Sequence, residues 1–190
     1  NMPNALEVIV SDPELKIDAL ILPGHVSTII GTKPYEFLAE KYGIPGVITG
    51  FEPVDVLQGI AMIMRQLHEG RAEIEIAYSR GVMREGNPVA LAAIDEVFDT
   101  VDATWRGLGV IPGSGYAIRE EFEAFDAVKR FHPEVEPTQN PKGCRCGDVL
   151  RGIMAPDECP LFRKVCTPEN PVGPCMVSSE GSCAAYYRYY

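Results

Sequence analysis

The chain has 190 residues, of which 46% are apolar and 23% charged, and this is the composition of a globular protein rather than a disordered, collagenous or coiled-coil one. Its formal net charge of −10 argues against nucleic-acid binding, because phosphate recognition needs a basic face. No apolar run approaches the roughly 20 residues that span a bilayer, and no secretion signal opens the sequence, so we expect a cytoplasmic protein. The first residues, Asn1-Met2-Pro3-Asn4, look like part of a helix start, and we expect a longer parent protein.

Cysteine and charge divide the chain in the same place. Residues 1–143 contain no cysteine and carry 12 Lys or Arg against 22 Asp or Glu, whereas residues 144–190 contain all six cysteines and five residues of each sign. Pro137, Asn140, Pro141 and Gly143 form a linker-like stretch just before this change. We therefore predict an acidic, cysteine-free body followed by a neutral, cysteine-rich tail.

The body alternates short apolar runs with helical patterns. Such alternation is typical of an α/β fold, with a parallel sheet and flanking helices. In chain order, we expect a helix near 5–10, a strand at 18–22, a helix over 35–42 ending at Gly43, a strand at 46–49, a helix from Pro53 to Gly70, a strand at 73–76, a helix from Asn87-Pro88 to Phe98, a strand at 105–111 and a turn at 112–115.

The tail is too rich in proline and glycine for long helices or a sheet, and a small segment of this kind needs a covalent or metal staple. Its cysteines follow the pattern Cys-x-Cys-x₁₂-Cys-x₆-Cys-x₈-Cys-x₇-Cys from Cys144 to Cys183. Three disulfides, structural zinc and an iron–sulfur cluster are all compatible with six cysteines. We favour the cluster, because four thiolates from separate loops can reach its corners and the remaining pair can exchange electrons.

Two strand-to-helix junctions in the body carry polar side chains. Pro23–Thr28 contributes His25 and Ser27, and Gly50–Asp55 contributes Glu52 and Asp55. In open parallel sheets such junctions face the ligand crevice, so these four residues are candidates for one pocket. The alternative is that Ser27 and Asp55 only cap helices. The sequence lacks the GxGxxG, Walker, HExxH and GxSxG motifs of common enzyme families.

Four segments carry a resemblance to one family. They are Pro23-Gly24-His25-Val26-Ser27-Thr28-Ile29-Ile30-Gly31, Gly50-Phe51-Glu52-Pro53, Trp105-Arg106-Gly107-Leu108-Gly109 and Gly173-Pro174-Cys175-Met176-Val177-Ser178-Ser179-Glu180-Gly181. Together they resemble the HypD family, which helps to build the Fe(CN)₂CO group of NiFe-hydrogenases. The resemblance covers essentially the whole chain but corresponds to the C-terminal half of the family, since its Cys-Gly-Gly-His-Thr and Gly-Pro-Gly-Cys-Pro-Val-Cys segments have no counterpart here.

The resemblance implies a Rossmann-like domain over residues 1–138 that forms one wall of a cleft, followed by a small, irregular, cysteine-rich 4Fe-4S domain over residues 139–190. It implies Cys144, Cys159, Cys166 and Cys183 as cluster ligands and Cys146 and Cys175 as a redox-active disulfide pair. His25, Ser27, Glu52 and Asp55 match motifs that face the cleft. HypC-like and HypE-like proteins are the implied partners, and iron with cyanide and carbon monoxide ligands is the implied cargo of the full-length protein.

Two other interpretations stay open. The chain can be a stand-alone electron-transfer or thiol-redox module, or its tail can be a purely structural element held by zinc or disulfides. The loss of a facing domain predicts an exposed apolar patch on the body.

Overall fold

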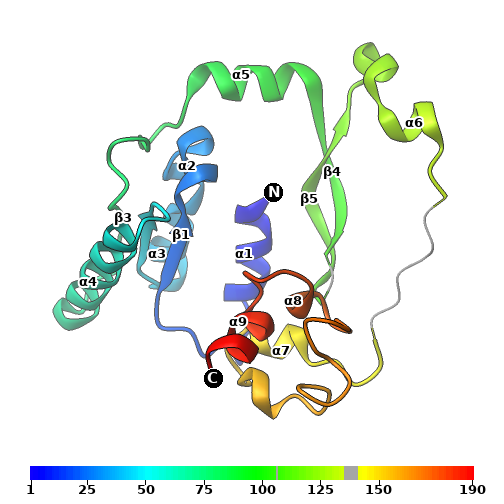
Figure 1. Cartoon of the computed structure of the whole chain (residues 1–190). Helices are drawn as coiled ribbons and strands as arrows, with labels where there is room; N and C mark the ends of the chain where they lie inside the picture. Colours follow the sequence, from blue (N-terminus) through cyan, green and yellow to red (C-terminus); the bar gives the residue numbers. More distant parts are fainter. Residues whose placement is uncertain (106, 135–140) are drawn as a thin grey trace. The chain divides into compact units, whose positions relative to one another are not determined.

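The structure is a computed structural model that describes residues 1–105, 107–134 and 141–190 (Figure 1). These residues form two compact units. One contains Ile17–Asp99 and Ala117–Arg119, and we call it the sheet unit; the other contains Asn1–Lys16, Thr100–Tyr116 and Glu120–Tyr190, and we call it the thiol unit because it holds every cysteine. The predicted boundary between residues 138 and 139 falls within 135–140, which lie outside the described residues.

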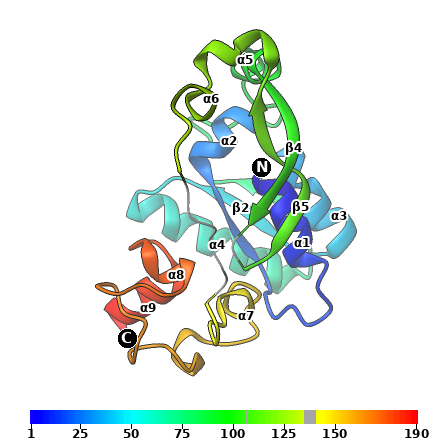
Figure 2. The same ribbon diagram turned by 90° about the vertical axis from the view of Figure 1, so that its right-hand side faces the viewer.

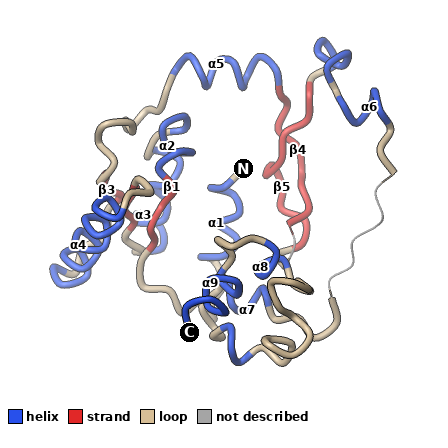
Figure 3. The backbone as a smooth tube through the Cα atoms, viewed as in Figure 1, coloured by secondary structure: helices blue, strands red, loops and turns tan. Residues whose placement is uncertain are grey.

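The sheet unit is built on a three-stranded parallel sheet, in the order β1 (Leu20–Pro23), β2 (Gly46–Thr49) and β3 (Ile74–Ile76) (Figure 3). In the register, Val47 lies opposite Ile21 of β1 and Glu75 of β3. All four residues of β2 are buried, as expected for a central parallel strand that is covered on both faces. The α/β class and the parallel sheet are therefore confirmed.

Helices connect and cover these strands. Gly43 and Gly70 end two of them with a φ of 65° each, the left-handed conformation that glycine adopts easily, and both predicted helix ends are confirmed. Tyr35 and Leu38 are fully buried. The helical elements of the sheet unit are α2 (Gly24–Ile30), η1 (Lys33–Tyr35), α3 (Glu36–Tyr42), α4 (Pro53–Glu69) and α5 (Pro88–Val97).

Helix α2 starts directly at the end of β1, without an intervening turn. This is possible because residue 24 is glycine: a Cβ atom there would overlap the carbonyl oxygen of Thr49 on the neighbouring strand. The close approach brings the first turn of α2 to the end of β2, and so fixes where His25 and Ser27 lie.

Strands β4 (Phe98–Trp105) and β5 (Gly109–Ile118) form a separate two-stranded sheet (Figure 2). The predicted strand at 105–111 is wrong, because the chain reverses there: the Leu108 N–H donates to the Trp105 carbonyl at 3.1 Å, and Gly107 and Gly109 have φ values of 86° and 84°. The turn predicted at 112–115 is also wrong, since these residues lie within β5. Phe98, expected to end a helix, opens β4 instead.

The thiol unit ends in a tail of short elements, as the proline and glycine content of residues 139–190 predicts. Its N-terminal helix joins the tail through Asp12, which pairs with Arg151, and through the Lys16 N–H, which donates to the Arg151 carbonyl at 3.2 Å. None of the helices in the described part of the chain has the length and apolarity to traverse a bilayer. The helical elements of this unit are α1 (Met2–Val10), η2 (Glu120–Phe125), α6 (Ala127–Phe131), α7 (Cys146–Leu150), η3 (Pro156–Glu158), α8 (Pro174–Val177) and α9 (Ser182–Tyr189).

Candidate thiol site and strand-edge site

The six cysteines gather in one cluster inside the thiol unit. Cys146, Cys166, Cys175 and Cys183 are buried together with Phe162 and Met176, and Cys144 and Cys159 pack against them half-buried. None of the six is in a disulfide. Because they come from five short segments that share no sheet or long helix, the thiols themselves make up much of the core that holds the tail together. This convergence is what a cysteine-based staple requires.

Cys175 hydrogen-bonds two other thiols of this cluster. Its Sγ atom donates to Cys183 Sγ at a distance of 3.0 Å between two buried side chains. Cys175 also hydrogen-bonds the Cys146 side chain, which lowers its pKa, but the bond to Cys183 and burial outweigh this effect and raise the pKa of Cys175 to about 11. The same bond lowers the pKa of Cys183. Cys175 is therefore the proton donor to Cys183, and it contacts two other thiols.

Backbone groups hold two further thiols. The Val172 N–H donates to Cys166 Sγ at 3.4 Å. Gly173 leaves room for Cys144 Sγ, because a Cβ atom at residue 173 would lie only 2.5 Å from this sulfur atom. Burial raises the pKa of the Cys144 thiol. Backbone N–H groups and small residues beside sulfur atoms are the kind of surroundings that tune iron–sulfur centres.

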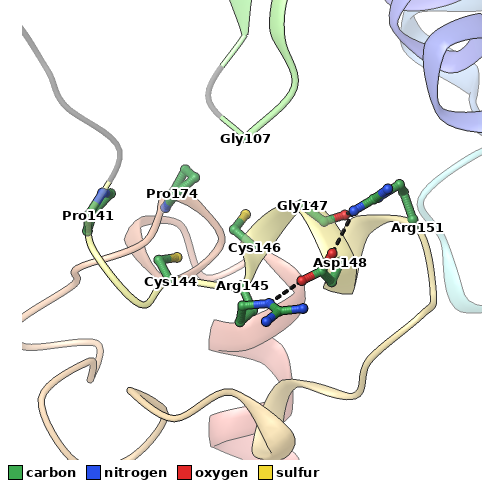
Figure 4. Close-up of a pocket in the computed structure, with 9 residues that line it drawn as sticks. All are labelled: Gly107, Pro141, Cys144, Arg145, Cys146, Gly147, Asp148, Arg151 and Pro174. Carbon is green, nitrogen blue, oxygen red and sulfur yellow. Dashed lines mark hydrogen bonds and ion pairs between the residues drawn. The ribbon is translucent and has the colours of Figure 1, made fainter.

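A pocket of about 240 Å³ opens beside the thiol cluster. Figure 4 shows the sulfur atoms of Cys144 and Cys146 on its wall, below Gly107 of the β4–β5 turn. A Cβ atom on Gly107 would be 3.9 Å from Cys146 Sγ, so the turn approaches this thiol closely. Two arginines line the same pocket, and both are paired with Asp148. Cys146 therefore both lines the pocket and hydrogen-bonds Cys175.

The thiols fit an iron–sulfur cluster by their chemistry. Within the described ranges, no three His, Cys, Asp or Glu side chains converge tightly enough to hold a single metal ion. A four-iron cluster carries its ligands at separate corners, and its thiolates surround a larger volume than the ligands of one ion do. Soft thiolate donors from separate segments suit that arrangement. The four thiols predicted as ligands are Cys144, Cys159, Cys166 and Cys183, and their roles stay a prediction.

The sheet unit carries a second candidate site at the carboxyl end of its parallel strands, and we call it the strand-edge site. Asp55, in the first turn of α4, is buried and accepts two hydrogen bonds from the Arg80 guanidinium, at 2.8 and 2.6 Å. The exposed Glu52 carboxylate lies 3.3 Å from the same guanidinium, whose carbon lies 4.4 Å from the centre of the Tyr78 ring. Arg80 therefore brings together the two predicted carboxylates, and its planar fork fixes their geometry.

The other two residues predicted here lie differently. The His25 ring packs against the Phe51 ring, with 4.6 Å between their centres. Ser27 is fully buried, and its hydroxyl donates to the Pro23 carbonyl at 2.7 Å. The helix-capping alternative does not describe Ser27, which bonds a carbonyl, but it describes Asp55 in part, because the Asp55 carboxylate bonds the backbone of Glu52 just before α4 as well as Arg80. Functional roles for all four residues remain predictions.

The pairing of Asp55 with Arg80 gives a pH-dependent prediction. Arg80 holds the pKa of the Asp55 carboxyl below its usual value, mainly through the hydrogen bonds and then through charge. Replacing Arg80 with glutamine is expected to bring this pKa back toward the ordinary value of about 3.9, measured by carbon-13 NMR titration. A lowered folded-state pKa stabilises the fold above the unfolded-state pKa, and this contribution is lost as the pH falls through the folded-state value.

The stability difference between the wild type and Arg80→Gln is therefore expected to be greatest at neutral pH and to shrink in acid. Arg84→Gln is the matched control, since Arg84 makes an equally close pair with Glu36 elsewhere in the sheet unit. It should leave the Asp55 titration unchanged. An Asp55 pKa that is the same in wild type and Arg80→Gln would show that the pair does not control this carboxyl.

Sequence reasoning missed three features of these sites. Arg80 belongs to no recognisable motif and follows Asp55 by 25 residues, so only the fold reveals their contact. The approach of Gly107 to Cys146 was missed because the hairpin was not predicted. The contact between Cys175 and Cys183 was missed as well, although a signal exists in the small residues Gly173 and Gly181, which leave room for neighbouring cysteines.

Comparison with known proteins places these sites in a family. The family model HypD, described as the hydrogenase formation hypA family, matches residues 1–190. The chain is 49% identical to the hydrogenase maturation factor HypD of Cupriavidus necator, over 98% of this chain and 51% of that protein. It is 48% identical to the hydrogenase expression/formation protein HupD of Azotobacter chroococcum, with coverage of 98% and 51%.

A putative hydrogenase expression/formation protein of Methanocaldococcus jannaschii is 50% identical, over 91% of this chain and 48% of that protein. The chain spans about half the length of the curated relatives that it matches. Since the family model covers every residue from 1 to 190, the chain belongs to the HypD family.

Proposed function

We propose that this chain acts in the maturation of NiFe-hydrogenases, as the part of a HypD-like factor that supplies electrons for assembly of the Fe(CN)₂CO group. The observation that carries the proposal is the gathering of six thiols in one buried cluster, in a chain of this family. Its relatives are named hydrogenase maturation factors, and these names support a role in hydrogenase maturation. Iron with cyanide and carbon monoxide ligands is cargo of the whole protein in this proposal.

The proposed cofactor is a 4Fe-4S cluster held by Cys144, Cys159, Cys166 and Cys183. When bound, such a cluster supplies single electrons at low potential. Cys146 and Cys175 act as the redox pair: two electrons and two protons convert their disulfide into two thiols. The hydrogen bond between Cys175 and Cys146 supports this pairing, and the pocket at Cys146 supports its role as the thiol that meets an external group.

The sheet unit, which we propose to be Rossmann-like, forms one wall of a cleft that holds the cargo. Glu52 is three-quarters exposed at the strand edge, where Arg80 orients it, and His25 presents its ring beside Phe51. Ser27 and Asp55 act from buried positions, Ser27 by holding the first turn of α2 and Asp55 by holding Arg80. These four residues and Arg80 are the proposed contribution of the sheet unit.

HypC-like and HypE-like proteins are the proposed partners. Helix α4 supports a protein partner, because its exposed side carries apolar residues at the spacing of a helix-packing seam. These residues are Leu57, Ile60, Met64 and Leu67, which are between 41% and 66% exposed. A cytoplasmic setting, in which thiols stay reduced, is part of the proposal.

Metal and sulfide analysis of the full chain, prepared without oxygen, tests the proposal. We expect about four iron and four sulfide per chain after reconstitution, with broad absorbance at about 400 nm that bleaches on reduction. Stoichiometric zinc without sulfide, from the same oxygen-free preparation, would contradict the cluster and favour a structural tail. A cluster that forms but cannot reduce a Cys146–Cys175 disulfide would contradict the electron-donor role.

A further inference from the structure

Cys175 has two thiol neighbours that the proposed function treats differently. Cys146 is its proposed redox partner, whereas Cys183 is a proposed cluster ligand. Cys175 Sγ nevertheless lies only 3.0 Å from Cys183 Sγ, where helix α8 packs on helix α9. Gly181 makes this packing possible, because a Cβ atom there would overlap the carbonyl oxygen of Cys175. The backbone therefore brings a redox thiol and a ligand thiol within reach of each other.

The three thiols differ in their position relative to the pocket beside the thiol cluster. Cys146, Cys175 and Cys183 are all buried, at 5%, 8% and 6% exposed, and of the three only Cys146 lines the pocket, together with the half-buried Cys144. Figure 4 shows Cys146 Sγ directed into the space below Gly107. A pocket of about 240 Å³ is large enough to admit the sulfur end of a small disulfide. Of the two thiols at the pocket, Cys146 is the one that hydrogen-bonds Cys175, so an external disulfide that enters the pocket can be passed from Cys146 to Cys175 and then to Cys183.

We propose that these residues form a three-thiol relay, in which an external low-molecular-weight disulfide converts the cluster-free chain into a form locked by a Cys175–Cys183 disulfide. This is a second disulfide, distinct from the Cys146–Cys175 redox pair. The relay rests on the positions of the thiols alone; its effect on the cluster rests on the proposed function, in which Cys183 is a ligand.

The chemistry balances in three exchanges. The Cys146 thiolate attacks the external disulfide, forms a mixed disulfide and releases one external thiol. The Cys175 thiolate attacks the Cys146 sulfur, forms the Cys146–Cys175 disulfide and releases the second external thiol. The Cys183 thiolate then attacks the Cys175 sulfur, so that Cys175–Cys183 forms and Cys146 regains a thiol. Overall two protein thiols lose two electrons and two protons, and one external disulfide becomes two thiols.

The lock has a regulatory consequence. With Cys183 in a disulfide, only three of the four proposed ligands remain, so the chain cannot accept a cluster until a dithiol reduces it. The exchange is reversible, and it protects buried thiols from further oxidation to sulfinic acid. Under oxidising conditions the relay thus holds the tail as the Cys175–Cys183 disulfide, and a reductant can convert this disulfide back into two thiols.

The test treats the reduced, metal-free full chain with one equivalent of oxidised glutathione, followed by alkylation of the remaining thiols and cleavage after glutamate. This cleavage separates the three sulfurs: Cys175 lies on residues 170–180, Cys183 on residues 181–190, and Cys146 on the peptide that ends at Glu158. We expect the 170–180 and 181–190 peptides to be joined and Cys146 to be alkylated. In Cys146→Ser, the joined product is expected to form about tenfold more slowly.

Accumulation of a Cys146–Cys175 link with alkylated Cys183 would overturn the proposal, and so would glutathione that stays on Cys146 or a product that forms at the wild-type rate in Cys146→Ser. Cys146→Ala, checked by circular dichroism, guards against a folding defect in the serine variant. Iron and sulfide are then added to the reduced and the locked chain. If the link forms but the reduced chain takes up no cluster, the proposed function fails while the relay stands.

Discussion

A Cys166→Ser variant of the full chain is expected to lose its iron–sulfur cluster, with bound iron falling from about four per chain to less than one after reconstitution. Among the four proposed ligands, Cys166 gives the clearest test of the ligand assignment. It is buried, it accepts the Val172 N–H, and it has no part in the thiol relay. A serine hydroxyl is a poor ligand for iron in a site of soft thiolates, so one corner of the cluster is left unbound.

Cys146→Ser is the matched control for this experiment. It changes a buried cysteine of the same hydrophobic cluster by the same single atom, but at a proposed redox position. We expect this variant to keep its iron, sulfide and absorbance at about 400 nm, although it can no longer form the Cys146–Cys175 disulfide. Equal iron content in wild type and Cys166→Ser would remove Cys166 from the ligand set, whereas iron loss in Cys146→Ser would exchange the two roles.

A Gly181→Ala variant is expected to destabilise the tail by about 1–3 kcal/mol, which is the usual cost of inserting a methyl group into a closely packed site. Alanine adopts the backbone angles of Gly181, φ −68° and ψ 145°, without strain. The cost arises instead from packing, since the new Cβ atom would overlap the Cys175 carbonyl oxygen. Helices α8 and α9 must then move apart, and Cys175 moves with its helix.

Thiol labelling measures this effect selectively, because every cysteine of the chain lies in the tail. For buried thiols that react only after local opening, a cost of about 1–3 kcal/mol accelerates labelling about 5- to 150-fold. Ser179→Ala, in the exposed turn that precedes Gly181, is the control and should label at the wild-type rate. Unchanged labelling of Cys175 and Cys183 in Gly181→Ala would mean that the two helices do not pack as closely as described.

The elements that sequence reasoning predicted well are those whose signals are local. Strand β2 is a short apolar run between glycines, and its limits follow from that run alone. Helix α4 has a proline at its start and a glycine just after its end, so both ends were predictable. The hairpin was mistaken because its region contains several glycines, and only the backbone angles show that Gly107 and Gly109 are the ones at the reversal.

The candidate sites depend on contacts between distant parts of the chain, and here local signals are insufficient. Spacing shows that six cysteines share a tail, but six cysteines allow 15 pairings, and nothing in the spacing distinguishes Cys183 from Cys146 as a neighbour of Cys175. The strand-edge carboxylates were found because strand-to-helix junctions are recognisable. Their arginine was not found, because it follows a third strand whose own end carries no motif.

The ion pair between Asp12 and Arg151 has a consequence for the order in which the protein forms. It joins segments 139 residues apart, and the two ends of the thiol unit enclose the whole sheet unit in the chain. Contacts of such long range form late, because the intervening chain must first be closed into a loop. During synthesis the sheet unit therefore emerges with all its strands available before Arg151 is made, whereas the cysteine tail can join the Asp12 segment only afterwards.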